Sequence, residues 1–200
     1  MKNAIKYSKK GIVMVTLFTT LLSFANENSF FNIKNDAKKT ALTLKSVKEG
    51  NQLSIIDNNG IILYREIIEK TGNYNKEFNL TSLPDGAYIF ELDKDLEINT
   101  IPFNIKSNII LFEKEKEKTI FKPLIRVKDD IVYVSKLSFN EQPLKIEIYF
   151  TGSNGSELMF TETIENTKVI ERIFKLDGLK FGSYKLVFHG EGREFIKYVN

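Results

Sequence analysis

The residue types that most often perform acid–base, nucleophilic or metal chemistry are scarce in this sequence. It has one histidine, His189, and no cysteine, so thiolate ligands, disulfides and cysteine nucleophiles are excluded. A catalytic histidine needs a positioned partner side chain, and no such partner can be assigned to His189. We expect His189 to be an exposed loop residue, and we predict no catalytic residue, no metal site and no cofactor.

Three short motifs hint at chemistry but are better explained as structural features. Residues 152–156, Gly-Ser-Asn-Gly-Ser, lack the order of a Gly-x-Ser-x-Gly nucleophile elbow and predict a hairpin. Residues 57–60, Asp-Asn-Asn-Gly, lack the alternating ligands and distant glutamate of a calcium-binding EF-hand loop. Glu66 and Glu69 lie three residues apart, as do the glutamates at 162 and 165. On a strand this spacing places them on opposite faces, so we interpret them as solvated charges.

The first 25 residues have the three parts of a secretory signal peptide. Four lysines precede an apolar run from Gly11 to Phe24, and Ser23 and Ala25 place small residues at a cleavage site. The run is shorter than the roughly 20 residues that a membrane-spanning helix needs. We therefore expect export to the periplasm or the cell exterior. The alternative is an uncleaved segment that anchors the chain in a membrane.

Removal of this segment changes the charge balance of the chain. The full sequence has 29 basic and 26 acidic residues, and the segment contributes four lysines and no acid. The remainder therefore has 25 basic and 26 acidic residues, a formal charge of −1. Because the excess of positive charge belongs to the targeting segment, the sequence predicts no binding to nucleic acid.

An internal repeat defines the domain organisation. Residues 64–88 align without a gap with residues 160–184, and nine of the 25 aligned positions are identical. Between the two copies lies an alternating Glu-Lys run at residues 113–118, which is typical of a solvated turn or linker. We predict a signal peptide over residues 1–25, a first domain over residues 26–115 and a second domain over residues 116–200.

Apolar and polar residues alternate along both copies, as in strands of an antiparallel sheet that has one buried face. In the second copy, for example, Leu144, Ile146 and Ile148 alternate with Lys145 and Glu147. Turn-forming residues recur every 8–12 residues, a spacing typical of β-sandwiches. The sequence therefore predicts an all-β protein with two tandem immunoglobulin-like antiparallel β-sandwich domains, each of about seven strands.

Both copies contain the pattern Leu-x-x-Leu-x-x-Gly-x-Tyr, for which we expect a structural role. The leucines would close the end of the sandwich where the chain crosses between sheets, and the glycine would adopt a backbone angle that other residues resist. The tyrosine hydroxyl would bond back to the crossing backbone, as in a tyrosine corner; the alternative is a tyrosine that binds a ligand. The pattern comprises Leu80, Leu83, Gly86 and Tyr88 in the first copy and Leu176, Leu179, Gly182 and Tyr184 in the second.

The stretch LSIIDNNGIILYRE, followed by FNLTSLPDGAYIFEL, resembles the C-terminal sorting domains of the type IX secretion pathway of Bacteroidetes. It is also similar to related small immunoglobulin-like domains of secreted proteins from those bacteria. The resemblance covers residues 53–92 in the first copy and 144–188 in the second, where the turn lacks the aspartate. It implies a β-sandwich fold and an address in the cell envelope, and it transfers no catalytic residue.

These expectations favour a non-catalytic interaction or structural protein of the cell envelope that binds another protein through sandwich faces or edges. Candidate contact residues on the outer faces are Ile56, Ile89, Tyr149 and Val187. One alternative is a carbohydrate-binding accessory protein that uses Tyr149. Another is a substrate of a type IX-like secretion pathway. An enzyme is disfavoured because no set of positioned acid–base partners can be assembled from the sequence.

Overall fold

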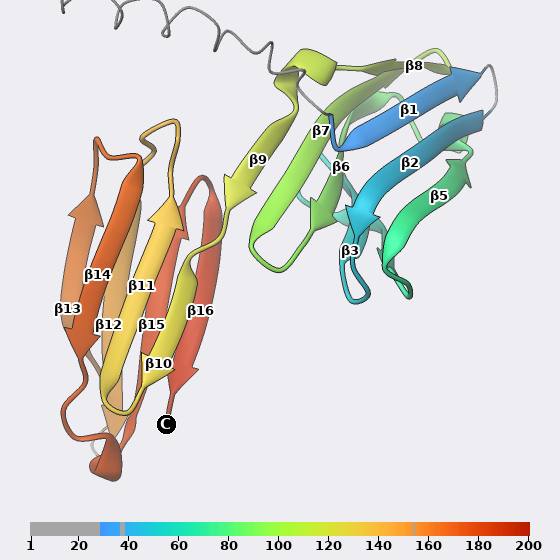
Figure 1. The fold of residues 1–200 in the computed structure, drawn as a ribbon. Coiled ribbons are helices and arrows are strands. Elements are labelled where there is room, and N and C mark those ends of the chain that lie inside the picture. The colour runs from blue at the N-terminus through green and yellow to red at the C-terminus, as the bar shows by residue number, and fades with distance from the viewer. Residues whose placement is uncertain (1–28, 37–38, 154) are drawn as a thin grey trace, which may run out of the picture.

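The computed structural model describes residues 29–36, 39–153 and 155–200, so the predicted signal peptide lies outside the described residues. This part of the chain folds into antiparallel strands joined by turns and three 3-10 helices, η1 (Leu80–Ser82), η2 (Lys114–Lys116) and η3 (Leu179–Phe181). Figure 1 shows two separate bodies of strands connected by β9 (Lys118–Phe121) and the segment after it. The prediction of an all-β protein is confirmed.

The first sandwich is built from two sheets. One has the order β1-β2-β5 and contains β1 (Phe31–Asp36), β2 (Lys39–Val47) and β5 (Gly72–Phe78). The other has the order β4-β3-β6-β7-β8 and contains β3 (Gln52–Asp57), β4 (Ile62–Ile67), β6 (Gly86–Asp93), β7 (Glu97–Lys106) and β8 (Ile109–Phe112). Strand β9 also pairs with β7.

The second sandwich repeats this plan. Its three-stranded sheet, in the order β10-β11-β14, contains β10 (Leu124–Lys128), β11 (Ile131–Leu137) and β14 (Val169–Lys175). Its four-stranded sheet, in the order β13-β12-β15-β16, contains β12 (Leu144–Gly152), β13 (Gly155–Ile164), β15 (Ser183–Gly190) and β16 (Arg193–Val199).

Seven strands of the first sandwich, β1 to β7, correspond one to one with β10 to β16, and β8 and β9 are additions to the first. The prediction of two tandem immunoglobulin-like sandwiches is therefore confirmed, with one difference from the constant-type arrangement. There the fourth strand joins the sheet of the first, second and fifth strands, whereas here it pairs with the third. The domain limits at residues 115 and 116 stay a prediction; β9 follows them and pairs with β7.

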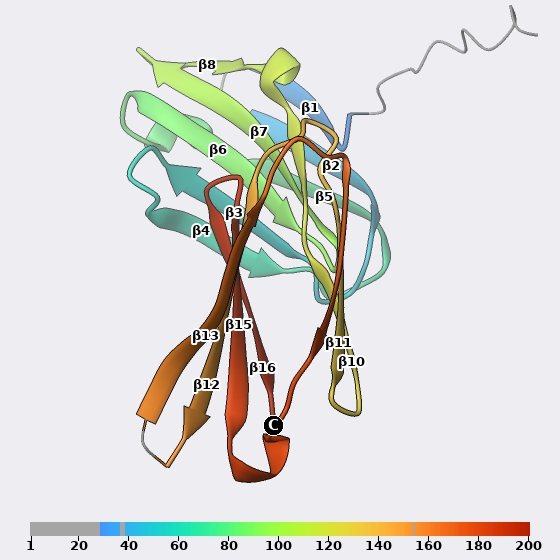
Figure 2. The ribbon, with the colours of Figure 1, turned by 90° about the vertical axis from the view of Figure 1, so that its left-hand side faces the viewer.

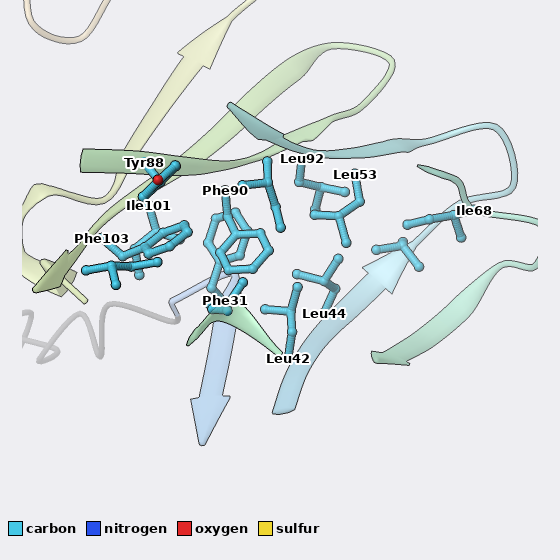
Figure 3. Packing of buried hydrophobic residues seen from close by; sticks show 14 residues of the cluster. Phe31, Leu42, Leu44, Leu53, Ile68, Tyr88, Phe90, Leu92, Ile101 and Phe103 are labelled. Carbon is cyan, nitrogen blue, oxygen red and sulfur yellow. The ribbon is translucent and has the colours of Figure 1, made fainter. Parts of the chain in front are cut away.

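Each sandwich has its own hydrophobic core because alternate residues of facing strands point inward. Leu42 and Leu44 of the first sheet meet Phe90 and Phe103 of the second, and all four are fully buried (Figure 3). The second core has the same origin and contains Val132, Val134, Leu144, Ile146, Leu186 and Phe188. The two cores share no residue, so each sandwich buries its own apolar side chains.

The two sandwiches also contact each other where loops of the second approach the first (Figure 2). Arg193, at the start of β16, forms an ion pair with Glu91 of β6. The rings of Phe121, at the end of β9, and Phe139, after β11, meet edge to face with centroids 5.4 Å apart. These contacts place β10 and the end of β11 beside the turn between β6 and β7.

Candidate functional site

The two leucines of each Leu-x-x-Leu-x-x-Gly-x-Tyr pattern lie around the 3-10 helices η1 and η3. Leu80 and Leu176 are buried in the first and second cores. Leu83 and Leu179 are partly exposed and pack against the same two cores. The side chains of this pattern are therefore engaged in packing at the crossover between the sheets.

The tyrosine of each pattern bonds to the backbone of its own crossover. The Tyr88 hydroxyl donates to the carbonyl oxygen of Pro84 at 2.7 Å, and the Tyr184 hydroxyl donates to that of Asp177 at 2.5 Å. Burial raises the pKa of Tyr184, and the negative charge of Asp177 adds to this effect. A hydroxyl bonded in this way holds the crossover against the following strand.

The glycines of the pattern correct the expectation that they need an unusual backbone angle. Gly182 has a φ of 178°, which is extended backbone, and the φ of Gly86 lies outside the left-handed region. The requirement at position 182 is space. A Cβ atom there would lie closer than 3.0 Å to the carbonyl oxygen of Thr151 and to the ring of Phe150, whereas a Cβ at Gly86 would make ordinary contact with the Tyr88 ring.

The four predicted contact residues lie on the outer faces of the two larger sheets. Ile56 and Ile89 face each other across β3 and β6, and both are half-buried. Tyr149 is also half-buried, with the Lys185 ammonium 6.0 Å from its ring centroid. Val187 is only 3% exposed, which corrects the expectation of an accessible contact there. Strand neighbours on both sides, β12 and β16, cover this short side chain.

His189 belongs to strand β15 and not to a loop, which corrects the expectation for this residue. Its Nε2 atom lies 3.0 Å from the Glu147 carboxylate, and its Nδ1 atom lies 3.6 Å from that of Glu194. Lys145 lies 2.5 Å from the same Glu147 carboxylate. Hydrogen bonds from Lys145 and then from His189 lower the pKa of Glu147. The group is a partly exposed network of polar side chains on the outer face of the four-stranded sheet.

The Asp-Asn-Asn-Gly turn at residues 57–60 is a backbone feature. The Asp57 carboxylate accepts hydrogen bonds from the backbone N–H groups of Asn59 at 2.9 Å and Ile61 at 2.8 Å. This is the bonding of an Asx turn. Among the described residues, no group of three or more histidine, cysteine, aspartate or glutamate side chains is arranged to hold a metal ion.

Large apolar side chains gather on the outer face of the β10-β11-β14 sheet. Tyr133 lies opposite Ile173, and Leu137 lies opposite Val169, so the face has two apolar pairs, with the pair of Ser135 and Glu171 between them. Their exposed fractions, with that of Leu124 on β10, range from 38% to 69%. We call this set the apolar face; it comprises Leu124, Tyr133, Leu137, Val169 and Ile173.

The equivalent face of the first sandwich is polar. Asn32, Thr43 and Asn75 form one row across β1, β2 and β5, and Lys34, Ala41 and Glu77 form the next row. The registers of the two sheets give the equivalent positions. Val132 lies opposite Phe174 in the second sandwich, and Thr40 lies opposite Phe78 in the first. One residue further along, Tyr133 and Ile173 therefore occupy the positions of Ala41 and Glu77. The same fold therefore forms with a polar surface here, and the apolar face is not a requirement of the fold.

A groove continues the apolar face across the junction between the two sandwiches. It has a volume of about 450 Å³, and five of its lining side chains are apolar: Leu96, Phe121, Leu124, Leu137 and Val169. Leu96, in the turn between β6 and β7, is 56% exposed. Glu97, Lys122, Lys136 and Glu171 also line the groove; the Lys136 side chain is buried and pairs with Glu191. Together the apolar face and the groove form the candidate functional site.

The charges around the apolar face are available to a partner. Arg126 and Lys128 of β10 and Glu171 of β14 are exposed, and none of these three side chains forms an ion pair with another described residue. Arg126 lies opposite Tyr133 on the β10 edge, and Glu171 lies on the β14 edge between the two apolar pairs. A surface that combines large apolar side chains with exposed charges is typical of protein-binding sites.

The apolar face is not among the sites predicted from the sequence, although the sequence contains a signal for it. Alternation along Ile131–Leu137 assigns Val132 and Val134 to the core, but Tyr133 and Leu137 are apolar at the intervening positions. The same holds for Val169 and Ile173 around the buried Ile170. A comparison of the two copies position by position would have shown that the outward set is polar in one and apolar in the other.

No family model matches this chain, and no curated protein sequence matches it. One solved structure that it is similar to is a biofilm-associated protein BSP domain, with 14% sequence identity and a TM-score of 0.26; the match covers 84% of this chain and 28% of that one. Another is the human OSCAR ligand-binding domain, with 6% sequence identity and a TM-score of 0.25; the match covers 85% of this chain and 96% of that one. Both TM-scores lie below 0.5, so neither similarity supports an argument about function. No helix within the described residues is long and apolar enough to cross a membrane.

Proposed function

We propose that the protein is a non-catalytic, exported interaction protein of the cell envelope that binds another protein through the apolar face and the adjoining groove. One observation supports this most strongly. Two copies of one sandwich share their core, crossover and strand order, yet the outer face of the three-stranded sheet is polar in the first and apolar in the second. A difference of this kind, which packing does not require, indicates a binding surface.

The chemistry of the face suits a protein partner. Burial of its five exposed side chains, at about 25 cal/mol per Å² of apolar surface, provides the main favourable free energy for association. Tyr133 adds an aromatic ring at the centre of the face, where interfaces concentrate their binding energy. Arg126 and Glu171, on the two edge strands of the face, would set the orientation of the partner.

The test is a cross-linked pull-down from an envelope extract with the wild-type chain, Tyr133→Lys and Ala41→Lys. Both variants place a lysine at the same position of the three-stranded sheet, one in each sandwich. We expect a reproducible protein partner whose capture falls by about tenfold or more with Tyr133→Lys and is unchanged with Ala41→Lys. Equal capture by all three chains, or no reproducible partner, contradicts the proposal.

Export is part of this proposal and is supported by residues 1–25, whose composition is that of a signal peptide. N-terminal sequencing of the chain recovered outside the cytoplasm should begin at Asn26. An intact Met1 in that fraction contradicts cleavage. The idea that the chain is itself a substrate of a type IX-like pathway is tested by deleting residues 194–199 and following export.

Carbohydrate binding is the second candidate, and one observation favours it. Lys185 lies opposite both Tyr149 and Tyr198, so two tyrosines flank a lysine on the outer face of the four-stranded sheet. Aromatic rings and a cation on one flat surface can bind an acidic sugar. Binding on a glycan array that is lost with Tyr149→Ala and retained with Tyr133→Ala would favour this candidate over a protein partner.

A further inference from the structure

Strand β14 is an edge strand of the β10-β11-β14 sheet. It pairs with β11 in an uninterrupted register from Val169 to Lys175, and no described strand pairs with its other side. Its outward side chains Val169, Glu171, Ile173 and Lys175 are all exposed, and Ile173 is 69% exposed. An exposed edge without a bulge or proline can accept a further strand. The carbonyl oxygens of Glu171 and Val169 on this edge each accept a side-chain hydrogen bond at 2.9 Å, from Arg172 Nη1 and Thr167 Oγ1, so an added strand would share these two acceptors.

The other edge on this side of the sandwich is protected. Strand β13 has a register shift where Ile148 opposes Phe160 and Tyr149 opposes Leu158, so Met159 is an extra, unpaired residue. A bulge of this kind interrupts the row of edge groups and bends the strand away from pairing. Strand addition is therefore favoured at β14 and not at β13.

The sequence of β14 is complementary to itself in one antiparallel register. When Ile173 lies opposite Ile173 of a second copy, Glu171 of each chain lies opposite Lys175 of the other. The centre then holds an apolar pair, and two oppositely charged pairs flank it. Each of these cross-strand pairs is favourable by roughly 0.2–1 kcal/mol.

The equivalent strand of the first sandwich excludes the same pairing. Ile173 corresponds to Glu77 of β5, because Phe174 and Phe78 occupy the same place in the repeat. The same register would place two Glu77 carboxylates opposite each other at the centre, where like charges are destabilising. The residue at the centre of this register is thus apolar in β14 and acidic in β5. This difference is expected if β14 pairs with a second copy and β5 does not.

We propose that the partner of this sheet is a second copy of the chain, joined through β14 in the register centred on Ile173. The two three-stranded sheets then form one continuous six-stranded sheet with two-fold symmetry, a closed arrangement in which the same patch is used by both subunits. This inference deepens the proposed function, since the two apolar faces become one surface of twice the area. In one chain, the Lys175 ammonium lies 3.6 Å from the Asp177 carboxylate and 3.9 Å from the Asp130 carboxylate. Such exposed ion pairs are weak, so Lys175 can leave them to pair with Glu171 of the second copy.

Sedimentation velocity of the purified chain over a range of concentrations tests this proposal. We expect a reversible dimer that dissociates with Ile173→Glu, which places two carboxylates at the centre, and persists with the matched variant Glu77→Gln. Glu171→Lys alone and Lys175→Glu alone should each raise the dimer dissociation constant by about tenfold. The double exchange of Glu171→Lys with Lys175→Glu should restore it.

A monomer at all concentrations, or a dimer that the double exchange does not restore, overturns the proposal. A dimer that dissociates with Tyr133→Lys but resists Ile173→Glu would mean that the apolar faces stack instead of the β14 edges pairing. Loss of the dimer with continued capture of a different protein would leave the proposed function standing without the self-association. Circular dichroism melts of every variant exclude unfolding as the cause.

Discussion

Glu162 and Arg172 form a two-point ion pair that joins the two sheets of the second sandwich. The Arg172 Nε atom donates to one carboxylate oxygen at 2.9 Å and its Nη2 atom donates to the other at 2.6 Å. In the first sandwich, Glu66 and Lys76 form the corresponding ion pair 96 residues earlier. The interpretation of Glu66 and Glu162 as solvated charges is therefore wrong, because each is half-buried against a cation from the opposite sheet.

This ion pair predicts an acid-sensitive part of the stability. Hydrogen bonding to Arg172 lowers the pKa of Glu162 below its ordinary value of 4.5. A carboxyl whose pKa is lowered by folding stabilises the protein above its ordinary pKa and loses that effect as the pH falls through the lowered value. At pH 7, Glu162→Gln should therefore destabilise the chain by about 1 kcal/mol or less, since the pair is partly exposed.

Thermal melts at pH 7 and at about pH 3 measure this effect. The difference between the wild-type chain and Glu162→Gln should shrink as the pH is lowered. Glu165→Gln is the control, because Glu165 is exposed and forms no ion pair with another described residue. A difference that stays constant across this range would mean that packing, and not charge, accounts for the contribution of Glu162.

The two pattern glycines should respond differently to the same substitution. Gly182→Ala places a methyl group closer than 3.0 Å to the Thr151 carbonyl oxygen, which belongs to the backbone and cannot move without shifting β12. We expect a loss of about 2–3 kcal/mol in the free energy of unfolding. Gly86→Ala makes only ordinary contacts and should cost less than about 1 kcal/mol.

Chemical denaturation of both variants, followed by circular dichroism, separates steric from conformational causes. If the glycines were required for their backbone angles, the two substitutions would be equally damaging. A large loss with Gly86→Ala would show that the structure around η1 is less tolerant than the distances indicate. A small loss with Gly182→Ala would show that β12 and η3 can move apart.

The tyrosine of each crossover provides a further prediction. Tyr184→Phe removes the donor to the Asp177 carbonyl oxygen, and Tyr88→Phe removes the donor to that of Pro84. Each change leaves the ring in place and should cost about 1 kcal/mol, the net value of one buried hydrogen bond. Urea titrations of the two variants check this. A cost near zero for both would mean that water replaces the hydroxyl and that the crossover is held by its leucines alone.

Much of the fold could be predicted from the sequence because its signals are local. Alternation along Leu144–Gly152 defines one strand, the Asp57 turn defines a hairpin, and the spacing of Leu176 and Tyr184 defines a crossover. The apolar face could not be predicted in this way. Tyr133 stands between the buried residues Val132 and Val134, so its type alone does not indicate that it faces solvent. Which side of β11 is buried depends on the opposite sheet of the sandwich, because that sheet covers only one of its two sides.

Contacts between distant residues were beyond the same reasoning. The sequence predicts an accessible Val187, yet its neighbours on β12 and β16 cover it. The sequence also predicts a loop at His189, beside Gly190, but pairing with Lys145 and Glu194 extends the strand past it. The burial of Val187 and the strand position of His189 both depend on residues of β12 and β16. A period-two pattern along β15 contains no information about those neighbouring strands.

The ion pair between Glu91 and Arg193 predicts that one sandwich stabilises the other. The Glu91 side chain is 8% exposed, and its carboxylate pairs with the Arg193 guanidinium across the junction. Arg193→Ala leaves this carboxylate nearly buried without a counter-charge, which should cost the first sandwich about 2 kcal/mol. Hydrogen exchange should show the loss as faster exchange of the β6 and β7 amides, although the substitution is in the second sandwich.

Arg126→Ala is the control for this prediction. It removes an exposed, unpaired guanidinium of the same sandwich and should leave the exchange of the β6 and β7 amides unchanged. Adding Glu91→Gln to Arg193→Ala should recover part of the protection, because a neutral amide is less costly to bury than a carboxylate. Unchanged exchange in β6 and β7 with Arg193→Ala would mean that the two sandwiches are independent in solution.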